Sequence, residues 1–318
     1  MTSTIHADKA KSSSRSWGRS LFAMAAALLL ICLSACSAKP GEASSEKPYV
    51  LATFTVIADI AQNIGGEYVQ VESLTKAGAE IHGYDPTPSD VRKASEADLI
   101  IANGLHLESW LDKFLQDSKA PAAILTEGIE PISITEDAGA GYPNPHAWMS
   151  PVAAQVYVDN IVKALSEVAP EHADDFENNA KAYKGQLEEV HQELVDSLSQ
   201  LPSNQRMLVT CEGAFSYLAA DAGLTEAYLW AVNSDGQTGA QRIAQIVEEV
   251  ATNNVPAVFC ESTVSARSME QVAAESHAKF GGTLYVDSLS EEGGPVPTYL
   301  DLIRYDTQLI ADALGSKD

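Results

Sequence analysis

The chain has 318 residues and a formal net charge of −24, with 44 acidic residues against 20 basic ones. This length is enough for about two domains with buried cores. A hydrophobic share of 45% with 20% charged residues excludes wholesale disorder and collagen-like or membrane-bundle classes. The excess of acid argues against a nucleic-acid partner, because phosphate binding requires basic patches. It is compatible with cations as ligands, although many soluble proteins are acidic for solubility alone.

The first residues have the pattern of an export signal. Four basic residues precede an uncharged apolar run, Leu21 to Leu33, which is too short to span a membrane comfortably. The run ends in Leu33-Ser34-Ala35-Cys36, which resembles a bacterial lipobox, whose cysteine receives diacylglycerol and becomes the mature N-terminus. We therefore expect a lipoprotein signal peptide at 1–35, lipidation of Cys36 and a flexible tether at 36–47. The alternative is a plain secretory signal in which Cys36 is incidental.

Removal of the signal changes the charge of the chain. Residues 1–35 contain four basic residues and one acidic residue, so the mature chain carries a formal −27. No later stretch approaches the length of a transmembrane helix. The sequence therefore predicts an exported protein that is tethered to a membrane by lipid.

After the tether, short apolar runs alternate with helical patterns. This alternation predicts an α/β fold with mainly parallel sheets flanked by helices. Residues 127–145 are rich in Gly, Pro and acidic residues and are expected to form a loop. The expected strands are 51–57, 68–74, 99–102 and 122–125, and the expected helices are 58–64, 89–97 with Ser89 as N-cap, and 105–115.

The middle of the chain has a different pattern. Between residues 171 and 201 there is no proline and a single glycine, Gly185. Apolar residues recur there every three or four positions, which predicts one amphipathic helix over 175–200, roughly 39 Å long. Because α/β alternation restarts afterwards, we expect a rigid linker helix; the alternative is a long packing helix within one domain. The apolar positions are Phe176, Ala180, Tyr183, Leu187, Val190, Leu194 and Leu198.

The second half of the chain again alternates short apolar runs with helical patterns. We therefore predict two α/β lobes joined by the long helix, an N-terminal lobe at 48–170, a linker helix at 171–201 and a C-terminal lobe at 202–318. The expected strands are 206–211, 226–230, 257–260 and 283–286, and the clearest helices are 239–252 and 298–314.

Four side chains lie where such lobes bind ligands, beyond the carboxyl ends of strands. Glu212 and Asp287 each follow an expected strand, and His82 and His146 lie in loops before helices. Two come from each half, so they could converge in a cleft between the lobes. Two imidazoles and two carboxylates suit a divalent transition metal. Their spacing alone is a weak signal, and the alternative is a pair of solvated or hydrogen-bonded loop histidines.

A resemblance to a known family supports this hypothesis. Six segments in order resemble the metal-binding lipoproteins of manganese, zinc and iron ABC importers, the cluster A-I solute-binding proteins. The match covers nearly all of the mature chain. It implies two α/β lobes joined by one long helix, with the four metal ligands at His82, His146, Glu212 and Asp287. The segments are GAEIHGYDPTPSD (78–90), NGLHLESWL (103–111), NPHAWMSP (144–151), CEGAFSYLA (211–219), FCESTVSAR (259–267) and DSLSEEGG (287–294).

The ligand set bears on the choice of metal. Relatives that resemble zinc importers usually have a histidine at the third ligand position and often a His-rich loop. This chain has Glu212 there, and residues 127–145 contain no histidine, so the set resembles the manganese (or iron) branch. Carboxylate oxygens suit Mn(II), although the Irving–Williams order predicts that Zn(II) binds such a site at least as tightly. We expect Mn(II) as the transported ligand, with Fe(II) and Zn(II) as alternatives.

Other residues near the expected site have supporting roles. Glu261 also follows a strand. We expect it to cap the strand end or to hydrogen-bond to a metal ligand, and the alternative is that it binds the metal directly. Trp148 is expected to pack beside His146. Cys211 and Cys260 each end an expected strand just before a glutamate. If those strands are neighbours, an oxidising compartment permits a Cys211–Cys260 disulfide; the alternative is two buried free thiols.

The resemblance implies a lipid-anchored receptor that captures the metal and delivers it to an ABC permease and its ATPase subunit. We expect a monomer, located outside the cytoplasm, with no nucleic-acid partner and no catalytic activity. An exported metallohydrolase is the main alternative, but no HExxH, GxSxG or CxxC motif supports it. An adhesin-type surface protein is a further alternative.

Overall fold

The computed structural model describes residues 1–2, 47–115, 118–135, 139–232 and 239–315. The predicted signal peptide, Cys36 and nearly all of the tether therefore lie outside the described residues. All elements below belong to the unit that begins at Lys47. Across the described ranges, no helix has both the length and the apolar character needed to cross a membrane.

The first half contains a parallel four-stranded sheet in the order β2-β1-β3-β4. Its two central strands are apolar and almost wholly buried. Successive side chains of a strand point to opposite faces, and helices cover both. Helices α2 and α5 pack on one face, and α3 and α4 on the other. The bounds are β1 Tyr49–Ala52, α2 Thr55–Gly65, η1 Gly66–Tyr68, β2 Gln70–Ser73, α3 Pro88–Glu96, β3 Leu99–Ala102, α4 Leu111–Leu115, β4 Ala122–Ile124, η2 Ala147–Met149 and α5 Pro151–Val168.

The second half contains two parallel strand pairs, β5 with β6 and β7 with β8. Strands β5 and β7 lie against each other, and α10 packs on β8. The predicted α/β class, with parallel strands flanked by helices, is therefore confirmed. The bounds are η3 Pro170–His172, α6 Ala173–Ser199, η4 Ser203–Gln205, β5 Met207–Glu212, α7 Ser216–Ala222, β6 Thr225–Trp230, α8 Ala240–Asn253, β7 Ala257–Glu261, α9 Arg267–Ser276, β8 Lys279–Leu284 and α10 Tyr299–Gly315.

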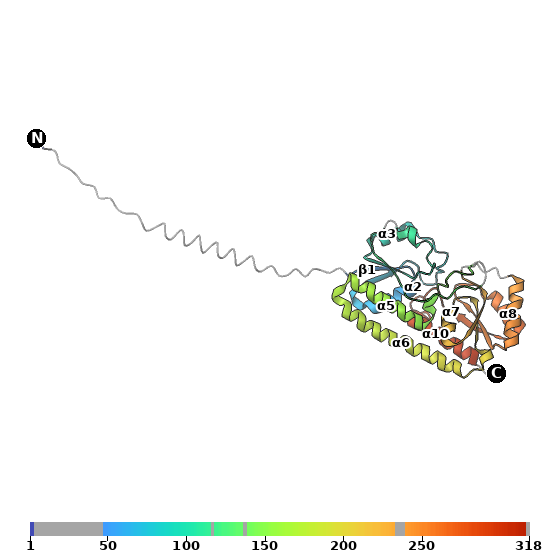
Figure 1. Cartoon of the computed structure of the whole chain (residues 1–318). Coiled ribbons are helices and arrows are strands. Elements are labelled where there is room, and N and C mark those ends of the chain that lie inside the picture. The colour runs from blue at the N-terminus through green and yellow to red at the C-terminus, as the bar shows by residue number, and fades with distance from the viewer. Residues whose placement is uncertain (3–46, 116–117, 136–138, 233–238, 316–318) are drawn as a thin grey trace. The chain divides into compact units, whose positions relative to one another are not determined.

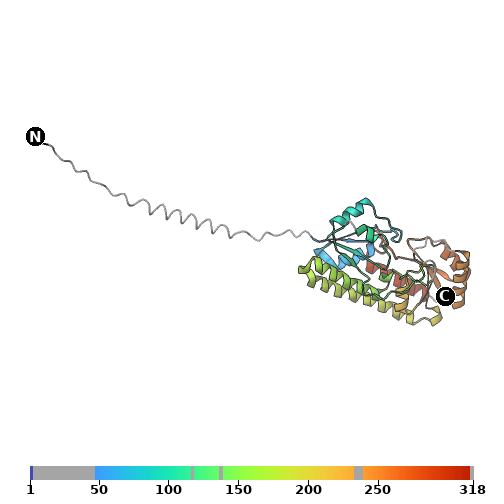
Figure 2. The same ribbon diagram turned by 45° about the horizontal axis from the view of Figure 1, so that its top comes forward.

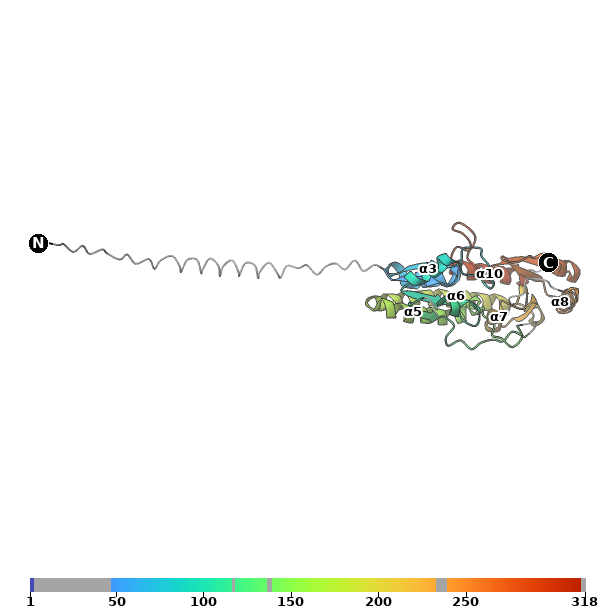
Figure 3. The same cartoon turned by 90° about the horizontal axis from the view of Figure 1, so that it is seen from above.

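The long helix α6 runs along one side of both halves (Figure 1). It lies beside α5, as the turned view also shows (Figure 2), and packs on α2 in the first half and on α10 and α7 in the second. The view from above shows α5, α6 and α7 in one layer (Figure 3). All seven apolar positions expected on its inner face are buried. A single helix of 27 residues that contacts both halves fits the expected linker, while the lobe boundaries at 170 and 202 stay a prediction.

The predicted helix over 105–115 is wrong in its first half. Leu105 and His106 have left-handed backbones, with φ of 52° and 65°, and α4 begins only at Leu111. The carboxylate of Glu108 accepts hydrogen bonds from the N–H groups of Asn103 and Gly104. A side chain that binds its own backbone in this way competes with helix formation.

Other predicted boundaries also shift. The strand expected over 51–57 ends at Ala52, and α2 begins at Thr55. Thr87 precedes α3 in place of the expected N-cap Ser89, because the Asp90 carboxylate accepts the Thr87 N–H in a capping box. The strand expected over 283–286 is β8, which ends at Leu284. Helices α5, α7 and α9 have no counterpart among the predicted ranges.

Candidate metal centre

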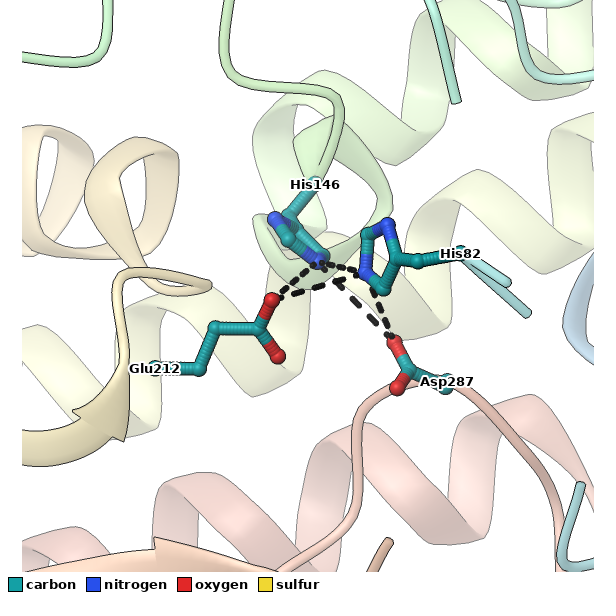
Figure 4. Close-up of side chains that lie close together, drawn as sticks. All are labelled: His82, His146, Glu212 and Asp287. Carbon is teal, nitrogen blue, oxygen red and sulfur yellow. Dashed lines mark hydrogen bonds and ion pairs between the residues drawn. The ribbon is translucent and has the colours of Figure 1, made fainter. Parts of the chain in front are cut away.

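The four side chains singled out in the sequence converge on one point (Figure 4). The Nε2 atoms of His82 and His146 are 3.0 Å apart. Glu212 Oε1 lies 3.5 Å from Nε2 of His82 and 4.0 Å from that of His146. Asp287 Oδ1 lies 3.7 Å and 3.9 Å from the same two nitrogens. One donor atom of each residue therefore faces a common centre.

The spacing of these donor atoms suits a metal ion. In tetrahedral coordination with bonds near 2.1 Å, neighbouring donors are about 3.4 Å apart. The four atoms all lie within 4.8 Å of one another. His146, Glu212 and Asp287 are buried, and the His82 side chain is only 7% exposed. A dication here would be almost removed from water, and the two carboxylates would balance its charge.

The fold brings these residues together at the ends of strands. Glu212 is the last residue of β5, and Asp287 follows β8 by three residues. His82 lies between β2 and α3, and His146 directly precedes η2 and α5. The carboxyl ends of parallel strands meet at one edge of a sheet, which is where such folds bind ligands.

Asn144 fixes the orientation of the His146 ring. Its Oδ1 accepts from the His146 backbone N–H at 3.0 Å and lies 2.9 Å from His146 Nδ1. Its Nδ2 donates to the carbonyl of Gly213 at 2.6 Å and to Ser216 Oγ at 3.1 Å, which sets the direction of the amide. Because an acceptor faces Nδ1, that nitrogen carries the proton, and Nε2 presents its lone pair to the centre.

Trp148 has a larger role than the expected packing. Its ring lies 5.0 Å from the His146 ring, and its Nε1–H donates to the carbonyl of Val286 at 3.0 Å. Val286 directly precedes Asp287. The Trp148 carbonyl in turn accepts from the Tyr299 hydroxyl, at the start of α10. Trp148 therefore connects the His146 segment to the Asp287 loop.

The loop that carries His82 is held mainly by its own residues. The Glu80 carboxylate accepts the N–H groups of His82 and Gly83. Further hydrogen bonds reach the other half. The Gly78 N–H donates to Ser288 Oγ at 2.7 Å and to the Leu289 carbonyl at 3.2 Å, and Ser288 Oγ donates to the Lys76 carbonyl at 3.4 Å. The His82 Nδ1 atom is buried and has no hydrogen-bond partner among the described residues.

The two carboxylate ligands have support of their own. The Glu212 backbone N–H donates to both carboxylate oxygens of the buried Glu261, at 3.3 and 3.2 Å. Glu261 thus lies behind Glu212, and its carboxylate is not among the four converging donors. Asp287 Oδ2 accepts from the Thr263 hydroxyl at 3.2 Å, while Asp287 Oδ1 has no hydrogen-bond partner within the part of the chain that the structure describes.

Burial shifts the ionisation of this region. Removal from water, reinforced by the neighbouring His82, holds the pKa of His146 well below its usual 6.5. Burial raises the pKa of Asp287 and raises that of Glu261 to about 8. His146 is therefore neutral at physiological pH, as a metal ligand must be. A bound cation would oppose the effect of burial on Asp287 and favour its ionised form.

The Cys211–Cys260 disulfide is present, so the alternative of two free thiols is wrong. The two Cα atoms are 4.9 Å apart because β5 and β7 lie against each other, although each of these strands pairs with a different partner. With Glu261 these cysteines form the other candidate metal-binding group among the described residues. Their sulfur atoms are bonded to each other, so that group does not offer two thiolates.

Sequence reasoning missed the supporting residues Glu80, Asn144, Thr263 and Ser288. Each lies within two residues of a residue that had been singled out, namely His82, His146, Glu261 and Asp287 respectively. Asn144 carried the best signal, since an amide two residues before a ligand histidine can accept its ring N–H. His106 lies outside the cluster and is exposed.

The chain is similar to a known protein family and to individual members of known function. Residues 50–313 match the family described as "Zinc-uptake complex component A periplasmic". The iron-binding protein YfeA of Yersinia pestis is 47% identical over 296 residues, 93% of this chain and 95% of that protein. The manganese ABC transporter substrate-binding lipoprotein PsaA of Streptococcus mitis is 33% identical over 297 residues, which cover 91% of this chain and 96% of that protein.

A solved structure is also similar. The Mn-bound periplasmic metal binding protein from Candidatus Liberibacter asiaticus has a TM-score of 0.79 and 39% sequence identity, and the match covers 84% of this chain and 100% of that one. The description of the family refers to zinc, and the names of these similar proteins refer to iron and manganese.

Proposed function

The chain belongs to the family of periplasmic zinc-uptake components, and we propose that it is the extracytoplasmic metal receptor of an ABC importer. One observation carries this proposal. Four donor atoms from four separate segments, two nitrogens and two oxygens, lie within 4.8 Å of one another in a buried position. A cluster of two carboxylates facing two imidazoles is unfavourable to bury without a cation, because each charged group loses its hydration.

We propose His82, His146, Glu212 and Asp287 as the metal ligands and Mn(II) as the transported ion, with Fe(II) or Zn(II) as alternatives. Glu212 supplies an oxygen donor, which suits Mn(II) and Fe(II) better than a third imidazole would. The relatives named for iron and manganese support this assignment. Zinc stays a competitor because its intrinsic affinity for such donors is higher.

The role we propose is binding and delivery rather than catalysis. Four protein donors leave little room for the exchangeable water that a metallohydrolase activates. The partners we propose are the permease of the importer and its ATPase subunit. We also propose that the mature protein is a monomer anchored to the membrane by lipid on Cys36, which places the metal centre outside the cytoplasm.

Competitive loading tests this proposal. The metal-free mature protein is exposed to equal amounts of Mn(II), Fe(II) and Zn(II) without oxygen, desalted and analysed for metal. We expect one bound ion per chain for the wild type and loss of that ion in Asp287→Ala. The control is Glu292→Ala, which removes an exposed acid from the same loop and should bind like the wild type. Absence of bound metal in the wild type would refute the proposal.

A further inference from the structure

The two carboxylate oxygens of Asp287 have different surroundings. Oδ1 faces the two imidazoles at 3.7 and 3.9 Å, and none of the described residues forms a hydrogen bond with it. Oδ2 accepts a hydrogen bond from the Thr263 hydroxyl at 3.2 Å. Figure 4 shows that the second oxygen of Asp287 points away from both rings. The carboxylate therefore presents one oxygen to the centre while the other is held by the protein.

Thr263 is itself held in place by strands that end at the site. It lies in the turn that follows β7, where the Val264 N–H donates to the Glu261 carbonyl at 3.4 Å. The preceding residue, Ser262, donates its N–H to the carbonyl of Leu284, the last residue of β8. Because this turn is fixed to β7 and β8, the Thr263 hydroxyl keeps its position beside Asp287.

The number of carboxylate oxygens that reach an ion affects which ion is preferred. Zn(II) is satisfied by four ligands in a tetrahedron, whereas Mn(II) favours more oxygen ligands in an octahedral arrangement. A carboxylate can bind through one oxygen or through both. A hydroxyl that holds one oxygen and fixes the carboxylate plane favours binding through the other oxygen alone.

We propose that Thr263 is a specificity-determining residue, which makes Asp287 bind the ion through Oδ1 alone and so restrains the coordination number of the site. This role rests on the proposed function, since it requires Asp287 to be a ligand. Thr263 does not touch the ion and acts only through Asp287. Its effect is to lower the affinity for Mn(II) relative to Zn(II), which opposes the contribution of the oxygen donor Glu212 and keeps Zn(II) a competitor at the proposed Mn(II) site.

Removal of the hydroxyl tests this role. Thr263→Val keeps the shape of the side chain and loses the donor, and Thr263→Ala loses the donor with a smaller side chain. We expect both to lower the Zn(II) affinity by about 10-fold, because altered support of a ligand typically costs 10–100-fold. We expect the Mn(II) affinity to stay the same, because the second oxygen of Asp287 then offsets that loss. The Mn(II)-to-Zn(II) affinity ratio should rise by about 10-fold in competition titrations with a chelating dye.

X-ray absorption of the Mn(II)-loaded protein measures the number of ligand atoms around the ion. This number would not change if Thr263 had only a structural role. We expect one additional oxygen in the coordination shell of both variants and the wild-type shell in Thr263→Ser, which keeps the hydroxyl. An unchanged affinity ratio and coordination shell in either hydroxyl-free variant would overturn the assignment. Failure of the wild type to bind either ion would defeat the proposed function, and the role of Thr263 with it.

Discussion

The two proposed histidine ligands are held in different ways. The His146 segment is fixed at both ends, because Asn144 donates to the carbonyl next to Glu212 and Trp148 donates to the carbonyl next to Asp287. The His82 loop is held mainly by Glu80 within the loop and by the contact of Gly78 with Ser288. The His146 Nδ1 has a hydrogen-bond partner in Asn144, whereas the His82 Nδ1 has none in the described ranges of the chain.

This difference indicates that the site is only partly preorganised. Hydrogen bonds from the side chains of Asn144 and Trp148 to backbone carbonyls beside Glu212 and Asp287 position the His146 segment relative to these two residues before an ion arrives. His82 completes the set from a loop with fewer fixed contacts. A donor that must be ordered on binding costs conformational free energy, whereas a prepositioned donor does not.

The strongest test of this comparison removes each imidazole in turn. We expect His146→Ala to lower the unfolding free energy of the metal-free protein by about 2–4 kcal/mol, because it leaves a cavity and takes a donor from Asn144. We expect His82→Ala to cost about 1–2 kcal/mol, because it also leaves a cavity but removes no hydrogen bond at Nδ1. Urea unfolding in the presence of a chelator measures both. Equal losses would contradict the comparison.

A more selective test changes the support of His146 and leaves the ligands intact. We expect Asn144→Ala to lower metal affinity by about 10–100-fold, because the His146 ring loses the acceptor that orients it. The measurement is a competition titration with a chelating dye. Asn179→Ala is the matched control, since that amide donates to the Ile64 carbonyl on α2 and does not contact the site. A similar loss in the control would point to general destabilisation.

The pH dependence of stability provides a further test. The unfolded chain protonates His146 as the pH falls through about 6.5, whereas the folded protein does so only at lower pH because burial lowers that pKa. This residue therefore contributes stability above pH 6.5, and that contribution is lost as the pH falls below it. We expect the difference in unfolding free energy between wild type and His146→Ala to shrink over this window when both are measured without metal. A difference that is constant with pH would show that His146 does not titrate in this way.

The smallest expected effect lies outside both regions. Gly185 is exposed inside α6, and a Cβ placed there meets no atom within 4 Å. We expect Gly185→Ala to raise the unfolding free energy by about 1 kcal/mol, because alanine has the higher helix propensity. Metal affinity should be unchanged, which separates general stability from the organisation of the site. Thermal unfolding and the same dye titration measure the two quantities.

Sequence patterns predicted the elements whose signals are local. The inner face of α6 follows from a sustained apolar period, and β3 from a short run of buried residues bounded by turn signals. The segment at Leu105 and His106 was predicted wrongly, because its apolar spacing resembles a helix while Glu108 holds the preceding backbone in a turn. Helix periodicity does not report such side-chain-to-backbone bonds.

The sequence by itself determined the α/β class and the long helix, because hydrophobic period is a property of short segments. It singled out the four residues that converge through six motifs that resemble a known family, since their residue types and spacing alone were a weak signal. Only the tertiary structure decided how those residues are held. The bonds of Asn144 to Gly213 and of Trp148 to Val286 join segments that lie 69 and 138 residues apart. The hydrogen bond from Thr263 to Asp287 Oδ2 likewise joins residues that lie 24 positions apart. Contacts of this kind depend on strand order and loop geometry, which no local pattern encodes.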